Sequence, residues 1–389
     1  MKLDGLTVLD LSLFLPGPAA TQLMADHGAR VIKVENPAAP EPTRSPNAFP
    51  WQQGGETVMF RNTQRGKESI ALNLKSESGK KALLALARKV DVVVEAFRPG
   101  VARRLGIDYE SLSAKNPGLV YCSISAFGQT GPWKDLPAHD TATVAAAGVL
   151  DVTRSPEGDS GPAIIGVPIA DMLSSYLALS GILMALYRRQ ATGSGDFVDI
   201  SMFESVLAAS PNILGPVFGG DQAPDRMKER THGGHAMLNI YATADGRHLA
   251  LGGGEHKFVE ALFEGLGRPD FIEDVVGPAG DGHGPAIAYL RDSFRSRPLV
   301  EWEEWFEGRD ICWSPVFTLK DAWDSDHVWA RGMRFKDNDG NDHIGSAIRY
   351  AKEAAQIRTK LPAIGEQTSC IIEELDLTDA DRKAILGGV

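Results

Sequence analysis

The sequence predicts an α/β fold with a large parallel-sheet domain and a smaller α+β domain. Over roughly the first 200 residues, short β-branched segments alternate with helical ones, which is typical of βαβ units. Near residue 226 the pattern changes to a hairpin and mixed helices. The length of 389 residues is sufficient for two or three domains.

The first 35 residues have the pattern of one βαβ unit. Residues 7–11 form a β-branched run, and residues 15–18, which include two prolines and a glycine, interrupt it. Residues 19–27 have helical composition, and residues 28–35 form a second strand after a glycine. A helix that joins two such strands predicts a parallel sheet.

The same alternation continues to residue 202. Residues 78–89 have the acidic start and basic end of a helix, and residues 90–95 and 119–124 are apolar strands. Residues 171–189 are apolar on nearly all sides, so we expect a helix packed deep between layers. Residues 196–202 supply one more strand.

The change in pattern divides the chain into domains. Residues 1–205 form the first part of the large domain, and residues 206–225, rich in proline and glycine, form a linker. Residues 226–325 form the small α+β domain, with an Asp-Gly hairpin turn between segments 238–241 and 248–251. Residues 326–389 form the return linker and the C-terminal part of the large domain, which ends in an acidic helix.

Composition excludes several classes of protein. A net charge of −11 argues against a general grip on nucleic acid. Cys122, Cys312 and Cys370 are widely spaced, so we expect neither a disulfide framework nor a zinc site, but a reducing, cytoplasmic compartment. The histidines lack metal-ligand spacing, so no metal site is predicted. The N-terminus lacks the pattern of a signal peptide, and no apolar stretch approaches the ~20 residues that span a membrane.

Ligands of open α/β sheets bind at the carboxyl ends of the strands. The loops at that edge are residues 11–18, 36–46, 96–104 and 125–140, and none has a GxGxxG or P-loop pattern. The chain also has a basic cluster whose guanidinium and ammonium groups are suited to phosphate, although the alternative is a solvated charged face. The cluster comprises Arg65, Lys67, Lys75, Arg98, Arg103 and Arg104.

Three polar residues are candidates for chemistry. Asp171 opens the apolar helix, where it is either an N-cap or a nucleophile or proton carrier. His139 precedes Asp140 in a loop beyond a strand, and is either a structural residue or a catalyst. Glu255 follows three glycines, which either form a simple turn or allow close approach of a substrate.

Read together, six segments resemble the class III CoA-transferase superfamily of the CaiB/BaiF type, which includes formyl-CoA transferase, carnitine CoA-transferase and α-methylacyl-CoA racemase. The resemblance covers nearly the whole chain. In order, the segments are LDGLTVLDLSLFLPGPAATQLMADHGARVIKVE, RGKESIALNLKSESGKKAL, DVVVEAFRPGVARRLGIDYESL, NPGLVYCSISAFGQTGPW, PAHD and GVPIAD with the following GILMALYRRQATGSGDFVDISM.

The resemblance implies a Rossmann-like large domain, a smaller α+β domain and an interlocked homodimer. It implies an acyl-CoA thioester as substrate, with no permanently bound cofactor, nucleic acid or membrane partner. Several members carry an arginine where this chain has Asn36, and Arg44 is the alternative contact. The CoA-binding residues carried over are Leu15, Pro16, Leu72, Asn73, Lys75, Ala96, Phe97, Arg98, Arg104, Ala138 and Asp140.

The resemblance also implies a catalytic set of His139, Asp171 and Glu255. This set matches the racemase pattern, in which His139 and Asp171 move a proton at the α-carbon of a 2-methylacyl-CoA and Glu255 orients His139. We therefore expect an α-methylacyl-CoA racemase. The alternative is a CoA-transferase in which Asp171 forms an anhydride and a thioester. Residues 141–143 and 172–175 depart from the racemase pattern, and a third possibility is an acyl-CoA-binding protein without activity.

Overall fold

The computed structural model describes residues 1–153, 161–225 and 228–387, and these form two units. Unit 1 comprises Met1–Ala147, Gly166–Ala209 and Ser325–Val389. Unit 2 comprises Gly148–Ile165 and Ser210–Asp324. Residues 148–165, which the sequence predicts to belong to the large domain, are part of unit 2, and the predicted boundary at residue 226 lies outside the described residues.

Unit 1 is built on a parallel sheet, as predicted. Within the described residues the sheet has six strands in the order β5-β2-β1-β6-β7-β8, all of them parallel. In chain order this is the 3-2-1-4-5-6 arrangement of a Rossmann-like fold, whose order reverses between β1 and β6. The strands are β1 (Thr7–Asp10), β2 (Arg30–Glu35), β5 (Glu68–Ala71), β6 (Val92–Glu95), β7 (Val120–Ser125) and β8 (Phe197–Ser201).

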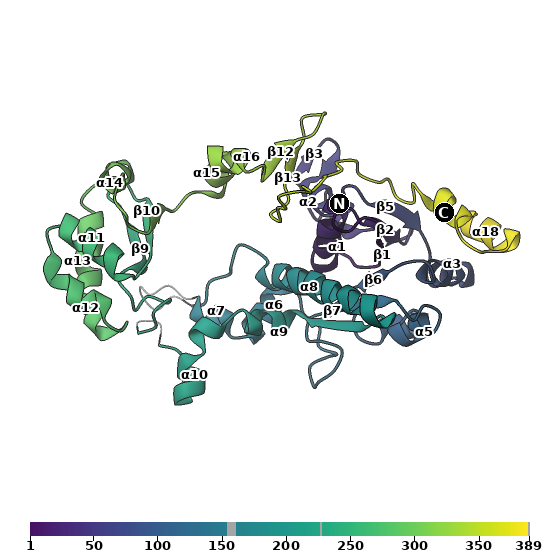
Figure 1. The fold of residues 1–389 in the computed structure, drawn as a ribbon, viewed down its shortest axis with the longest axis horizontal. Coiled ribbons are helices and arrows are strands. Elements are labelled where there is room, and N and C mark those ends of the chain that lie inside the picture. The colour runs from purple at the N-terminus through teal and green to yellow at the C-terminus, as the bar shows by residue number, and fades with distance from the viewer. Residues whose placement is uncertain (154–160, 226–227, 388–389) are drawn as a thin grey trace. The chain divides into compact units, whose positions relative to one another are not determined.

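Helices cover both faces of this sheet (Figure 1). On one face, α1 (Pro16–Asp26) packs against β1, β2 and β6, and α8 (Ile169–Thr192) packs against α1, β7 and β8. On the other face lie α3 (Glu77–Ala87), α5 (Tyr109–Ser113), α17 (Thr368–Glu373) and α18 (Asp379–Leu386). Helix α18 contacts α3 and α17 contacts β5, so the C-terminal segment helps to cover this face.

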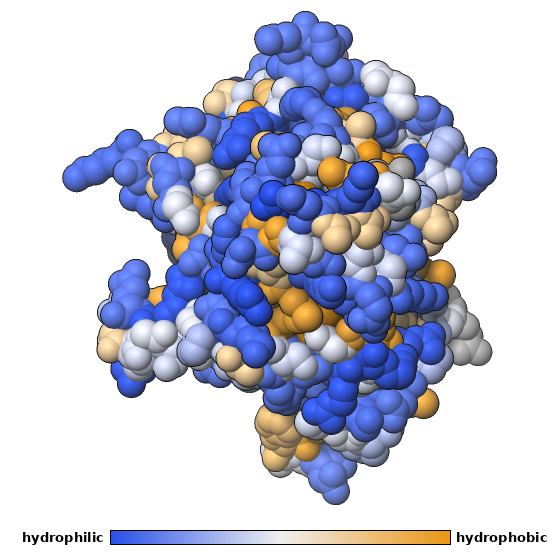
Figure 2. All heavy atoms as spheres, turned by 90° about the vertical axis from the view of Figure 1, so that its right-hand side faces the viewer, coloured by the Kyte–Doolittle hydropathy of each residue, from blue (hydrophilic) through white to orange (hydrophobic). Residues whose placement is uncertain are grey.

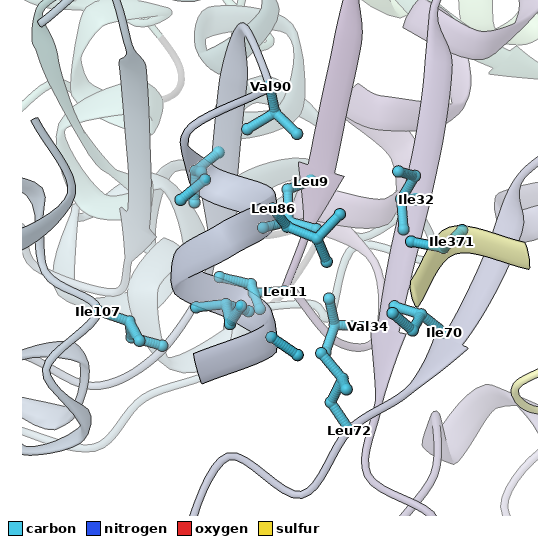
Figure 3. Packing of buried hydrophobic residues seen from close by; sticks show 14 of the residues in the cluster. Leu9, Leu11, Ile32, Val34, Ile70, Leu72, Leu86, Val90, Ile107 and Ile371 are labelled. Carbon is cyan, nitrogen blue, oxygen red and sulfur yellow. The ribbon is translucent and has the colours of Figure 1, made fainter. Parts of the chain in front are cut away.

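The core under the second face is aliphatic (Figure 3). Leu9 and Ile32 of the central strands meet Leu86 of α3, and Ile70 of β5 meets Ile371 of α17. All five side chains are at least nine-tenths buried. Hydrophilic residues cover most of the surface seen in Figure 2, the side on which α3 and α18 lie. The helices therefore bury one side against the sheet and turn the other to solvent.

Helix α1 begins three residues earlier than the sequence predicted. Pro16 and Pro18, which we expected to interrupt the chain before the helix, occupy its first turn, and the helix runs from Pro16. Proline fits there because the first amide groups of a helix have no partner within it. Gly17 is required by close packing, since a Cβ at this position would overlap the Ser12 side chain.

Helix α8 corrects two expectations. By length and composition alone this 24-residue helix is apolar enough to cross a membrane, although we expected no such stretch. Its packing against α1, α9 and the sheet is that of a core helix. It is also not buried on all sides, because a helix on a sheet buries one face: Met184 is 67% and Tyr187 is 78% exposed.

Unit 2 is an α+β unit with an antiparallel sheet of three strands within the described residues. The predicted hairpin is present, with Gly246 at φ +75° in its turn. Trp302, Phe294 and Phe306 form its aromatic core. The elements are β9 (Leu238–Ala242), β10 (His248–Gly252), β11 (Trp313–Pro315), α11 (His256–Gly265), α12 (Ile272–Val276), α13 (Gly284–Phe294) and α14 (Leu299–Phe306).

Shorter elements complete both units, including a helix in the segment that we expected to be a plain linker. In the part of the chain that the structure describes, these elements are α2 (Val58–Gln64), α4 (Val101–Leu105), α6 (Asp140–Ala146), α7 (Val149–Val152), α9 (Met202–Ala208), α10 (Gly215–Gly220), α15 (Leu319–Asp324), α16 (Asp326–Ala330), β3 (Gln52–Gln53), β4 (Glu56–Thr57), β12 (Arg334–Lys336), β13 (Asp342–Ile344) and four 3₁₀ turns at Pro42–Arg44, Pro211–Ile213, Pro269–Phe271 and Asp281–His283.

Candidate active site

A cavity of about 680 Å³ lies in unit 1, beyond the carboxyl ends of β1, β6 and β7. Its walls are residues 13, 14 and 16, residues 96–99, residues 124–126, Lys134, residues 136–142, Asp171 and Met202. Strands β1 and β6 flank the point where the strand order reverses, which is where open α/β sheets bind ligands. Three of the four loops selected from the sequence contribute to it, and the loop of residues 36–46 does not.

Two of the predicted catalytic residues share this cavity. His139 is the residue before α6, and its carbonyl oxygen accepts hydrogen bonds from Thr143 N at 3.1 Å and Thr143 Oγ1 at 2.9 Å. Asp171 lies in the first turn of α8, and both side chains line the cavity wall. The structure therefore brings an imidazole and a carboxyl group to the same ligand-sized space.

Asp140 joins the loop of His139 to the helix of Asp171. Its Oδ1 accepts hydrogen bonds from Ala170 N at 2.7 Å and from Asp171 N at 3.2 Å. These are amide groups of the first turn of α8, which have no partner within the helix, so Asp140 caps α8 from another segment. Ser175 supplies a second link, because its Oγ donates to Pro16 O at 2.7 Å and fixes α8 to the start of α1.

The surroundings of Asp171 favour its protonated form. Burial raises the pKa of Asp171 from 3.8 to about 7, and the negative charge of Asp140 adds to the rise. The ionised and the protonated carboxyl are therefore both populated near neutral pH. The ionised form is a nucleophile and the protonated form is an acid, so the site is suited to covalent catalysis and to proton transfer.

The segment after β6 is held by a buried carboxyl group. Glu95 is 3% exposed, and its Oε2 accepts a hydrogen bond from Phe97 N at 2.6 Å. Burial raises the pKa of Glu95 to about 7. This contact fixes Phe97 and Arg98, two of the predicted CoA contacts, at the cavity wall.

Six of the eleven predicted CoA-binding residues line the cavity: Pro16, Ala96, Phe97, Arg98, Ala138 and Asp140. The described lining does not include the other five. The side chain of Leu72 packs in the sheet core, so only its backbone can face a ligand. Asn73, Lys75 and Arg104 are exposed, and Leu15 is the residue before α1.

The residues of the predicted basic cluster do not form one exposed surface. Lys67 Nζ lies 3.0 Å from Asp10 Oδ2 in the interior, and Arg65 pairs with Asp26 at 2.9 Å, also buried. These two charges are paired inside the protein and are not available to phosphate, because a buried cation is retained only with a partner. Lys75, Arg98, Arg103 and Arg104 are exposed.

Arg44, the alternative to Asn36 as a CoA contact, has its guanidinium engaged by other residues of unit 1. Its Nη2 lies 2.7 Å from Glu35 Oε1, and its guanidinium stacks on Phe60 at 4.0 Å from the ring centroid.

Glu255 belongs to unit 2, where it is the residue before α11. The glycines that precede it are required by packing within this unit. A Cβ on Gly254 would lie 2.8 Å from the His235 ring, and a Cβ on Gly253 would lie 2.7 Å from Cys312 Cβ. The contact between Glu255 and His139 stays a prediction.

Among the cavity-wall residues that sequence reasoning missed, two have unusual surroundings. Phe14 has a left-handed backbone and contacts the His139 ring, and no local pattern marks it. Ser125 ends β7, and its buried Oγ has no hydrogen-bond partner among the described residues. The position of Ser125 at the carboxyl end of a strand was a usable signal.

Comparisons with known proteins agree with this geometry. The profile of CoA-transferase family III matches residues 3–368. Acetyl-CoA:oxalate CoA-transferase of Acetobacter aceti is 34% identical over 97% of this chain and 96% of its own length. Alpha-methylacyl-CoA racemase of Homo sapiens is 31% identical over 96% and 93%. Other relatives carry CoA-transferase names.

The fold agrees as well. The crystal structure of a CAIB/BAIF family protein from Brucella suis has a TM-score of 0.81 and 29% sequence identity, and the match covers 96% of this chain and 99% of the other. The predicted resemblance and fold class are thus confirmed. The chain belongs to CoA-transferase family III and is an acyl-CoA enzyme.

Proposed function

We propose that the protein is a CoA-transferase that moves CoA from an acyl-CoA thioester to a second carboxylic acid. The observation that carries this proposal is the carboxyl group of Asp171, which lines a ligand-sized cavity and has a pKa raised to about 7. Most of the relatives named above are CoA-transferases, which favours this activity over the racemase expected from the sequence.

The ionised Asp171 carboxylate attacks the thioester carbonyl, and the carbon–sulfur bond breaks. The CoA thiolate is released, and a mixed anhydride between Asp171 and the acyl group remains. The thiolate attacks the Asp171 carbonyl of this anhydride and releases the donor acid, which leaves a thioester between Asp171 and CoA. The acceptor carboxylate then attacks the Asp171 carbonyl of this thioester, the carbon–sulfur bond breaks, and a second anhydride forms as the CoA thiolate is released. The thiolate attacks the acceptor carbonyl, which yields the new acyl-CoA and restores the Asp171 carboxylate.

The neighbouring groups support each step. A ring N–H of His139, which lines the same cavity, is suited to the negative charge that develops on a carbonyl oxygen. Arg98 is exposed at the cavity wall, where it is suited to a CoA phosphate. CoA enters and leaves as a substrate, and no permanently bound cofactor is proposed.

A racemase is the second candidate, because His139 and Asp171 line the same cavity and the human racemase is 31% identical to this chain. In that reaction one of the two groups removes the α-proton and the other returns a proton on the opposite face. Glu255 would orient His139 in this reading.

One experiment separates the two activities. The purified protein is incubated in D2O with a 2-methylacyl-CoA, and in parallel with acetyl-CoA or succinyl-CoA and a panel of dicarboxylates that includes oxalate and glutarate. Mass spectrometry follows the acyl-CoAs. New acyl-CoA species that disappear in Asp171→Asn support the transferase. Deuterium at the α-carbon without any CoA transfer would establish the racemase and overturn the proposal.

The proposal includes a homodimer. Helix α8 turns large apolar side chains to solvent, which a partner subunit would cover: Tyr176, Leu177, Leu183, Met184 and Tyr187. Light scattering after gel filtration should give twice the chain mass. A mass of one chain at micromolar concentration would contradict this part of the proposal. The cytoplasm, with its acyl-CoA pools and reducing conditions, is the compartment we propose.

A further inference from the structure

Phe14 has a backbone conformation that its side chain does not favour. Its φ is +63°, in the left-handed region, and among the described non-glycine residues only one other has a positive φ. A bulky residue persists there only when its surroundings hold it, and such residues concentrate at functional sites. Phe14 lines the cavity that contains His139 and Asp171.

A buried ion pair holds this conformation from one side. Lys33 Nζ lies 2.9 Å from Glu41 Oε2, and the two side chains are 2% and 0% exposed. Glu41 Oε1 accepts a hydrogen bond from Phe14 N at 3.0 Å, and Lys33 Nζ donates to Ser12 O. The pair therefore binds the backbone on both sides of Leu13.

A second buried ion pair fixes the start of the same loop. Asp10 Oδ2 lies 3.0 Å from Lys67 Nζ, and Asp10 Oδ1 accepts hydrogen bonds from Ser12 N at 3.0 Å and Ser12 Oγ at 2.5 Å. Buried ion pairs lose much of their attraction to desolvation, so they contribute little to stability. Two of them beneath one short loop favour a role in fixing its geometry.

The held side chain meets the candidate catalytic histidine. The Phe14 and His139 rings lie edge to face, with centroids 6.2 Å apart and an interplanar angle of 74°. The backbone of His139 is fixed by Thr143, so the contact with Phe14 bears on the direction of the imidazole. The chain of contacts thus runs from Lys33 and Glu41 through Phe14 to His139.

We propose that Phe14 is a positioning residue that sets the orientation of the His139 imidazole, and that the Lys33–Glu41 pair holds Phe14 for this purpose. The catalytic consequence rests on the function proposed above, whereas the positioning itself does not. A misplaced catalytic group loses rate because the reacting atoms leave their aligned geometry. Turnover should therefore depend on Phe14 more strongly than acyl-CoA binding does.

The test uses the full-length protein with ¹³C-labelled histidine. The His139 ring resonance is assigned by its loss in His139→Gln, and its chemical shift is then measured in Phe14→Leu, Phe14→Tyr and the control Phe218→Leu. Phe218 is 81% exposed in α10 and does not belong to the cavity wall. The turnover number kcat and the Michaelis constant KM for acyl-CoA are measured for the same variants.

In Phe14→Leu the His139 resonance should move and kcat should fall by about 10- to 100-fold, with KM changed by less than about 3-fold. Phe14→Tyr, which retains the ring, should restore both values, and Phe218→Leu should change neither. An unmoved His139 resonance in Phe14→Leu would overturn the proposal.

Glu41→Gln tests the holding pair. Glutamine keeps an oxygen for Phe14 N but removes the charge opposite Lys33, so the His139 resonance should move in the same direction as in Phe14→Leu. If Glu41→Gln is folded and this resonance is unchanged, the role of the pair is refuted. If this variant does not fold, the double variant Lys33→Met/Glu41→Gln, which leaves no unpaired buried charge, replaces it. A moved resonance with unchanged kcat would uphold the positioning and refute the use of His139 in the reaction.

Discussion

Replacing Asp171 with asparagine should stabilise the protein at and above neutral pH. The pKa of Asp171 in the folded protein is raised from 3.8 to about 7, because burial and the Asp140 charge oppose ionisation. A carboxyl group with a raised pKa contributes fully to the free energy of unfolding below the pKa that it has in the unfolded chain. This contribution is lost as the pH rises through the pKa that the group has in the folded protein. Asparagine cannot ionise, so the variant escapes this loss.

The magnitude follows from the size of the rise. For a fully buried carboxyl, a change from 3.8 to about 7 corresponds to about 4 kcal/mol. Asp171 is partly exposed, so solvent screening reduces the expected gain to about 1 to 2 kcal/mol. In a unit of this size that gain is about 3 to 6 °C in Tm.

The assay is thermal unfolding of both proteins between about pH 4 and 8.5, with exposed Asp376→Asn as the control. Other groups with raised pKa values, such as Glu95, are common to both proteins and cancel in the difference. The Tm difference should be near zero at the acid end, grow through pH 7 and then level off. A difference that does not change with pH, or an Asp171→Asn variant less stable than the wild type at pH 8, would refute the reasoning.

Three further predictions concern the cavity and the start of α1 beside it. The rate of CoA transfer should rise with pH through about 7 as Asp171 ionises. Asp140→Asn, whose amide oxygen still caps α8, should shift this rise to lower pH because the negative charge beside Asp171 is removed. A rate that does not depend on pH would contradict the role of Asp171 as the nucleophile. Gly17→Ala should destabilise the protein by about 1 to 3 kcal/mol in urea unfolding, because the alanine Cβ would overlap the Ser12 side chain. An unchanged urea midpoint would show that the loop containing Ser12 can move to accommodate the methyl group. Ser125→Ala should leave Tm nearly unchanged but raise KM for acyl-CoA by about 2- to 10-fold, because the unpartnered Ser125 hydroxyl is free to bind the ligand. An unaltered KM would show that this hydroxyl does not contact acyl-CoA.

Local sequence patterns predicted the parallel sheet except for its edge strand β5, where no strand was expected. The β-branched runs that became β1, β2, β6 and β7 lie in a sheet buried on both faces, where apolar strands are continuous and unambiguous. The hairpin at Gly246 was equally predictable, since an Asp-Gly turn has few alternatives. The errors fall where tertiary packing decides, such as the proline-rich start of α1 and the exposed side of α8.

The candidate site was predicted less completely, for physical reasons. Asp171 and His139 were identified, because a residue at a helix start and a residue beyond a strand end are recognisable positions. The buried partners of Arg65 and Lys67 depend on side-chain contacts between segments far apart in the chain, which composition does not reveal. The strained conformation of Phe14 depends on Glu41, 27 residues away, for the same reason.

The most direct test of the proposed reaction is to trap CoA on Asp171. The protein is mixed with an acyl-CoA donor in the absence of an acceptor acid, quenched rapidly in acid, digested and examined by mass spectrometry. We predict a CoA thioester on the peptide that contains Asp171, lost when an acceptor carboxylate is added and absent in Asp171→Asn. An unmodified Asp171 peptide, recovered while new acyl-CoA forms at the full rate, would contradict the account.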